Sequence, residues 1–101
     1  MPKTKTQPFD AAEHLDDEET IAAYVEEALA TGDPAFVAHA LGVVARARGM
    51  GQVARDAELS RESLYKTLSA NGNPELGTVL RVLHALGLRL TVQPEAPGAA
   101  R

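Results

Sequence analysis

Apolar residues recur at intervals of three and four along much of the chain, which is the spacing of one face of an α-helix. The first such stripe begins after Asp16 or Asp17, either of which can cap a helix, and ends at Gly32. A second spans residues 33–49 and starts with an Asp-Pro pair, an N-cap followed by a first-turn proline. The pattern therefore predicts two long helices in the first half of the chain.

Three further helices are predicted in the second half. Residues 51–57 have a face of small side chains, so their helicity depends on packing against a neighbour. Ser60 can cap a helix over residues 61–69, which the Asn-Gly-Asn-Pro run at 71–74 ends. A last apolar stripe begins at Leu76 and is closed by Gly87. The chain is therefore expected to form five helices.

Near the end of the chain, the spacing of apolar residues changes from that of a helix to that of a strand. Apolar and polar side chains alternate over residues 88–93, which predicts a short strand ended by Pro94. Residues 94–101 are rich in Pro, Gly and Ala and predict a disordered tail. The expected fold is all-α with a short C-terminal β-strand. The main domain is expected over residues 35–93, followed by the tail. Before it stands an acidic segment, residues 1–34, with one helix that packs on the domain or extends it.

Length and composition agree with a small helical protein. A chain of 101 residues can close one hydrophobic core, and with 45% apolar but only 4% aromatic residues that core consists of Ala, Val and Leu. The absence of cysteine excludes disulfides, thiolate zinc sites and cysteine nucleophiles and fits a reducing compartment, so a cytoplasmic location is expected. We expect neither a signal peptide nor a membrane-spanning helix.

Charge is distributed unevenly. The formal net charge of −4 at pH 7 would by itself oppose nucleic-acid binding. Residues 1–34, however, hold nine acidic and two basic side chains, whereas residues 35–91 hold seven basic and four acidic ones. An acidic front and a basic body indicate two different partners.

Candidate residues for catalysis or metal binding are missing from the sequence. His14, His39 and His84 share no ligand spacing and have no cysteine or paired acid beside them. The acidic run 16–19 lacks the spacing of a calcium loop, and the chain has no phosphate loop or serine elbow. We therefore expect no enzyme activity, no cofactor and no metal.

The two short helices are the feature most informative about function. Glu58, Leu59 and Ser60 form the turn between them, and Ala54 is small at the point where the helices would cross. In DNA-binding proteins this arrangement lets one helix cross the phosphate backbone while the second enters the major groove.

Five runs of sequence are characteristic enough to suggest a family. They are PFDAAEHL at 8–15, ARARGM at 45–50, LSRESLYKTLS at 59–69, NGNP at 71–74 and LHALGL at 83–88. They resemble the lambda-repressor type of helix-turn-helix domain and, more closely, the addiction-module antidote proteins. The resemblance covers about residues 8–92.

The resemblance implies a lambda-repressor-like (Xre/Cro) fold and a HigA-like antitoxin. Such a protein neutralises a small basic toxin similar to the RelE, ParE and HigB group. It also represses the shared promoter as a homodimer on double-stranded operator DNA. One position departs from the pattern, because families with this fold usually have glycine where this chain has Glu58. That position tends towards the left-handed region, where a side chain costs about 1 kcal/mol.

The second short helix would present Arg61, Glu62 and Ser63 to the bases from its first turn. Arg61 is the leading candidate, because its guanidinium can bond O6 and N7 of one guanine. Glu62 either accepts from a cytosine amino group or caps the helix and holds Arg61. The residues expected at phosphates are Gln52, Arg55, Lys66, Asn73 and Arg46. For Arg55, Lys66 and Arg81, an ordinary solvated charge is an equal alternative.

Protein partners are predicted less sharply. Dimer contacts are expected from the last helix and from the strand, where pairing across a twofold axis would bury Leu88, Leu90 and Val92. The strand could instead join a sheet of the toxin, and the sequence leaves both possibilities open. The acidic residues 8–31 either bind the toxin or only keep the protein soluble. A free-standing Xre-type transcriptional regulator without a toxin, and a pure protein-interaction module, are the alternative functions.

Overall fold

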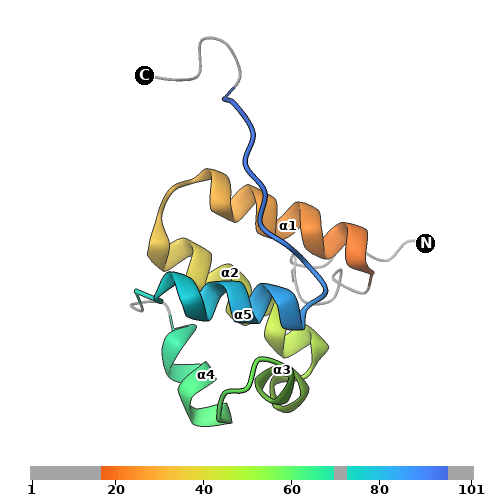
Figure 1. Cartoon of the computed structure of the whole chain (residues 1–101), viewed down its shortest axis with the longest axis vertical. Coiled ribbons are helices and arrows are strands. Elements are labelled where there is room, and N and C mark those ends of the chain that lie inside the picture. The colour runs from red at the N-terminus through yellow and green to blue at the C-terminus, as the bar shows by residue number, and fades with distance from the viewer. Residues whose placement is uncertain (1–16, 70–72, 96–101) are drawn as a thin grey trace, which may run out of the picture.

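The structure is a computed structural model that describes residues 17–69 and 73–95. These residues form five α-helices, which confirms the all-α prediction. The helices are α1 (Glu18–Ala30), α2 (Pro34–Arg48), α3 (Met50–Asp56), α4 (Arg61–Thr67) and α5 (Leu76–Ala85). Figure 1 shows α1 at one end of the molecule, α5 across its middle, and α3 with α4 at the opposite end. The predictions made for residues 8–16, 71–72 and 96–101 lie outside the described residues.

Side-chain caps set the starts of the long helices as the sequence predicted. The Asp17 carboxylate accepts the Thr20 backbone N–H at 2.7 Å, and the Asp33 carboxylate accepts that of Ala35 at 3.1 Å. After α5, Gly87 adopts a φ of +79°, which lets the Leu88 N–H reach the Leu83 carbonyl at 2.8 Å. Local chemistry therefore determines where these helices begin and end.

The two short helices differ slightly from their predicted bounds. α3 begins one residue earlier than expected, at Met50, and α4 ends at Thr67 rather than two residues later. Gly49 separates α2 from α3 with a φ of +105°, a conformation that residues with a side chain rarely adopt. The chain can thus change direction between two helices without an intervening loop.

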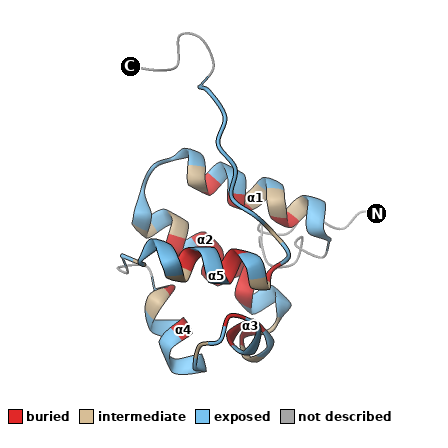
Figure 2. Cartoon of the chain, in the orientation of Figure 1, coloured by how far each residue is buried: buried red, intermediate tan, exposed pale blue. Residues whose placement is uncertain are grey.

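One apolar core receives side chains from all five helices. α1 packs against α2, and α3 contacts α2, α4 and α5. The largest fully buried side chains are Ile21, Leu41, Val44, Leu64, Val82 and Leu86. In Figure 2 the buried positions lie where the helices face one another, whereas much of α4 is coloured as exposed. Because α1 contributes Ile21 and Val25, the helix of the acidic front shares the core of the rest of the chain.

The strand predicted over residues 88–93 is not found among the described residues. These residues are extended coil, and within the described part of the chain no backbone–backbone hydrogen bond joins 89–95 to another segment. Alternating apolar and polar side chains are not enough to form a strand, because a strand also needs backbone hydrogen bonds to a neighbouring strand. The five helices offer no such neighbour. The segment instead runs across α1 (Figure 1), with Leu88 packed against the core.

Candidate nucleic-acid interface

α3, the turn 57–60 and α4 form one compact unit, called here the helix pair. Within the turn, the Leu59 N–H donates to the Ala54 carbonyl at 2.8 Å and the Glu58 N–H donates to the Arg55 carbonyl at 3.1 Å. Ala54 and Leu64 are both buried, with exposed fractions of 3% and 0%. α3 and α4 pack against each other, and Ala54 faces the core with them, which agrees with a small side chain at this position.

Glu58 has a φ of +61°, so the turn does enter the left-handed region. The Arg81 guanidinium, on α5, donates through Nη1 to the Ala57 carbonyl at 3.3 Å and lies 3.5 Å from the Glu58 carbonyl. These carbonyls end α3, where a cation is favoured by the helix dipole. This role of Arg81 is not apparent from the sequence, because its partners lie 24 and 23 residues away along the chain.

The first turn of α4 brings the three proposed base-reading residues together at the surface. Ser60 caps this turn, since its Oγ accepts the Ser63 N–H at 3.0 Å. Arg61, Glu62 and Ser63 are all exposed. Within the described residues the one ion pair is Arg48–Glu18, so Glu62 does not hold Arg61 in place. The cap belongs to Ser60, and both charged side chains stay available to a ligand.

Two of the proposed phosphate-contacting residues belong to one hydrogen-bonded chain on α3. Arg55 Nη2 donates to Gln52 Oε1 at 2.8 Å, and Gln52 Nε2 donates to Asp56 Oδ1 at 3.0 Å. All three side chains are exposed. These hydrogen bonds fix the direction of the Gln52 amide along the helix. The Asp56 carboxylate would compete with a phosphate for the N–H groups of Gln52.

The other proposed phosphate contacts divide between two regions. Lys66 and Asn73 are exposed near the end of α4 and after it. Arg46, by contrast, acts on Tyr24 of α1: burial raises the pKa of Tyr24, and the nearby positive charge of Arg46 opposes that rise. Arg48 lies 4.0 Å from Glu18. The arginines of α2 thus lie beside α1, whereas the candidates on α3 and α4 share the far end of the molecule (Figure 1).

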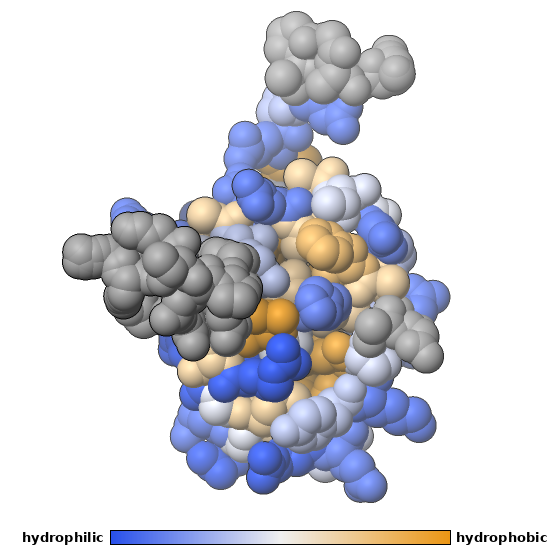
Figure 3. All heavy atoms as spheres, turned by 180° about the vertical axis from the view of Figure 1, so that it is seen from behind, coloured by the Kyte–Doolittle hydropathy of each residue, from blue (hydrophilic) through white to orange (hydrophobic). Residues whose placement is uncertain are grey.

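The surface of that end is polar. In the view from behind, blue hydrophilic residues line the lower edge of the molecule, where α3 and α4 lie (Figure 3). Phosphate contacts draw on polar and cationic side chains of this kind. Tyr65 is the large apolar exception on α4, with an exposed fraction of 50%.

The described residues contain no group of three His, Cys, Asp or Glu side chains that could hold a metal ion. His39 instead stacks on Phe36, with ring centroids 6.2 Å apart. No helix in the described part of the chain is both long and apolar enough to cross a membrane.

The fold and the exposed helix pair define a small all-helical protein. A family model described as "Probable addiction module antidote protein" matches residues 5–94, and the chain belongs to this family. A relative from Haemophilus influenzae, described as an uncharacterized protein, is 52% identical over 85 residues, which cover 84% of this chain and 88% of the relative. No solved structure matches the chain.

Proposed function

We propose that this protein is the antitoxin of a type II toxin–antitoxin module, which neutralises a small basic toxin and represses its own operon as a DNA-binding dimer. The observation that carries the proposal is membership of the antidote family across residues 5–94. An antidote requires a toxin, and we propose one similar to the RelE, ParE and HigB group. The protein has no catalytic role in this proposal and acts in the cytoplasm, beside its operator.

The helix pair supplies the DNA-binding part of the proposal as a lambda-repressor-like helix-turn-helix. α4 enters the major groove with its first turn, where Arg61 binds a guanine and Glu62 accepts from a cytosine amino group. Ser63 lies beside them and contacts either base edge. The proposed phosphate contacts are Gln52, Arg55, Lys66, Asn73 and Arg46.

A dimer follows from the geometry of this mode of binding. Two recognition helices must enter successive major grooves about 34 Å apart, which a twofold-symmetric pair of subunits achieves. Two surfaces can supply its contacts. One is the segment with Leu88, Leu90 and Val92, and the other is the outer side of α5, where Leu76 and Leu80 have exposed fractions of 64% and 43%.

Fluorescence polarisation with the labelled promoter of this gene tests the DNA-binding proposal. Wild-type protein is expected to bind it at low salt, and Arg61→Ala to bind roughly 5- to 100-fold more weakly, the equivalent of one guanine contact. Arg89→Ala removes the same charge from an exposed site outside the helix pair and serves as the control. Wild-type protein that does not bind its promoter, or Arg61→Ala that binds as tightly as wild type, contradicts the proposal.

A free-standing transcriptional regulator is the second candidate, because the helix pair needs no toxin to bind DNA. The neighbouring gene separates the two functions. An adjacent reading frame for a basic protein of about 100 residues, a single-domain length, is expected for an antitoxin. Co-expression then shows whether the two products form a complex.

A further inference from the structure

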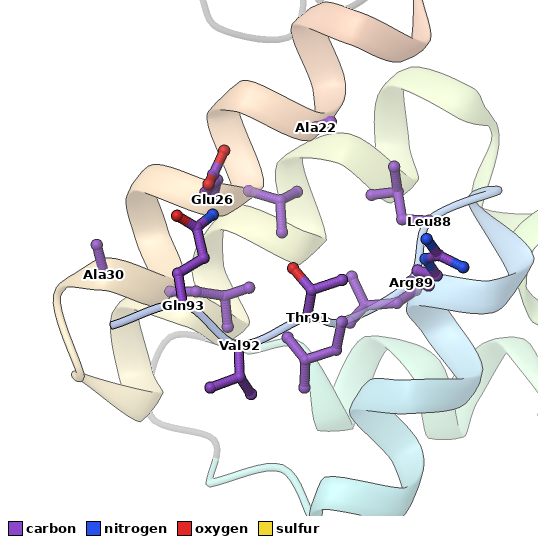
Figure 4. A pocket seen from close by; sticks show the side chains of 12 residues that line it. Ala22, Glu26, Ala30, Leu88, Arg89, Thr91, Val92 and Gln93 are labelled. Atoms are coloured by element: carbon purple, nitrogen blue, oxygen red, sulfur yellow. The ribbon is translucent and has the colours of Figure 1, made fainter. Parts of the chain in front are cut away.

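A groove lies between α1 and the extended segment 88–93, at the opposite end of the molecule from the helix pair. It has a volume of about 470 Å³, within the range of roughly 300–1,000 Å³ that is usual for ligand pockets. Val25 and Leu29 of α1 line one side, and Leu88 and Leu90 line the other. Figure 4 shows the groove from close by. Two charged residues, Glu26 of α1 and Arg89 of the segment, belong to its lining, and Figure 4 shows the Glu26 carboxylate beside the Gln93 side chain.

Residues 88–93, which form one wall of the groove, expose both apolar side chains and backbone groups. Leu90 and Val92 have exposed fractions of 40% and 94%, although both are apolar. Within residues 17–69 and 73–95, the backbone of 89–95 makes no hydrogen bond to another segment. Apolar side chains and free backbone groups on one extended stretch are the features that a second protein chain can bind.

The α1 side of the groove is uniformly acidic. Residues 17–33 carry six carboxylates, all exposed, and no lysine or arginine. Of these six, Glu26 lines the groove, and the other five lie on or beside α1 outside its lining. Glu18 is partly neutralised by Arg48 at 4.0 Å, whereas no ion pair among the described residues involves Glu19 or Glu26. A ligand in this groove therefore meets apolar walls with Glu26 on one side and Arg89 on the other, and the surface of α1 around the groove is acidic.

We propose that this groove docks the toxin, by taking apolar side chains of a basic segment of that protein between α1 and residues 88–93. The proposal rests on the proposed antitoxin function and specifies the surface that performs it. The basic side chains that flank such a segment pair with the carboxylates of α1, so charge steers the encounter and apolar burial holds the complex.

A second copy of this chain is the rival occupant, and its charge disfavours it. A twofold axis through the groove would bring one acidic α1 against another, and like charges across an interface oppose association. The outer side of α5 offers the dimer another apolar surface, because Leu76 and Leu80 have exposed fractions of 64% and 43%. The charges beside Leu80 are of both signs, Arg81 with Asp56 and Glu58. The structure thus assigns the groove to the toxin and α5 to the dimer.

The test compares the same substitution at two sites of similar exposure. Leu90→Asp places a charge in the groove, and Leu80→Asp does the same on α5; the two leucines have exposed fractions of 40% and 43%. The probe is the purified basic protein encoded next to this gene, with affinity measured by calorimetry and oligomeric state by light scattering. Circular dichroism and thermal melts verify that both variants are folded.

Leu90→Asp is expected to weaken toxin binding roughly tenfold or more and to leave the dimer intact. Leu80→Asp is expected to weaken the dimer and to leave toxin binding unchanged. Glu26→Lys should weaken toxin binding more than Glu27→Lys, because Glu27 carries the same charge on the same helix but does not line the groove.

Each other outcome has a defined meaning. If wild-type protein does not bind the neighbouring product, the proposed antitoxin function is wrong and this inference fails with it. If wild type binds but Leu90→Asp binds equally well, the inference alone is wrong. If Leu90→Asp yields monomers with unchanged toxin affinity, a second copy occupies the groove and the assignment is overturned.

Discussion

Glu58 has a backbone conformation that is unfavourable for a residue with a side chain. Its φ of +61° belongs to the left-handed region, and the turn holds it there through Arg81, which binds the carbonyls at the end of α3. Strain of this kind persists only where neighbouring contacts enforce it. Because Arg81 links α5 to the turn before α4, a substitution at Arg81 can alter the position of α4 although Arg81 does not belong to that helix.

Glu58→Gly should therefore stabilise the protein. Glycine removes the cost of the left-handed conformation, about 1 kcal/mol, but gains freedom in the unfolded chain, so we expect a net increase of about 0.5 kcal/mol in the free energy of unfolding. Urea denaturation measures it. Glu58→Ala removes the carboxylate but keeps a Cβ, and an equal gain in that variant would mean that charge, not backbone strain, is responsible.

Asp17 gives the start of α1 a defined pH dependence. The hydrogen bond from the Thr20 backbone N–H, with a further one from the Thr20 side chain, lowers the pKa of Asp17 below its ordinary value of 3.8. The ionised form thus favours the folded state. Its contribution is fully present above the unfolded pKa near 3.8 and is lost as the pH falls through the lower, folded value.

Asp17→Asn keeps an oxygen that can accept from Thr20 but does not titrate. The difference in free energy of unfolding between wild type and Asp17→Asn should be constant above about pH 5 and should shrink below the unfolded pKa. Urea titrations at a series of pH values measure that difference. An NMR titration that returns an unshifted or raised pKa for Asp17 would contradict the capping role.

At the scale of elements, the sequence predicted what local chemistry determines. Asp17 and Asp33 cap helices that their apolar stripes predicted, and Gly87 ends the last one. Two features could not be predicted, because each depends on a distant partner. The segment 88–93 has the side-chain period of a strand but is coil, because it has no edge to pair with, and Arg81 meets the turn only through the tertiary fold.

Ala54→Leu should disrupt the helix pair. Ala54 has an exposed fraction of 3% and its carbonyl anchors Leu59, so a larger side chain forces α3 away from its neighbours. Overpacking of this kind costs about 1–3 kcal/mol of unfolding free energy. Ala47→Leu makes the same change at an exposed position of α2 and should stay within about 0.5 kcal/mol of wild type. If both variants unfold at the same urea concentration, close packing at Ala54 is not what holds the pair.

For the whole molecule, the uneven charge gives the two ends different tasks. The six carboxylates of residues 17–33 lie on and around α1 with no lysine or arginine among them. The helix pair at the other end is neutral overall, because it carries three basic and three acidic residues: Arg55, Arg61, Lys66, Asp56, Glu58 and Glu62. A single net charge of −4 conceals this division. Both partners that we propose are charged, operator DNA negatively and toxin positively. The acidic end attracts the toxin and repels DNA, so DNA approaches the neutral helix pair more favourably than it approaches α1.

Salt dependence distinguishes the two kinds of DNA contact that this division requires. A residue that neutralises a phosphate releases counterions, so Lys66→Gln should reduce the slope of log K against log salt concentration by about 1, on operator and unrelated DNA alike. Arg61→Ala should instead reduce the preference for operator over a site with the contacted guanine replaced, because a base contact carries sequence information. Polarisation measurements at four salt concentrations on both DNAs provide the slopes and the preference. If Arg61→Ala lowers binding to every sequence equally while Lys66→Gln alters sequence preference, the two residues have exchanged roles and α4 lies in the groove in a different orientation.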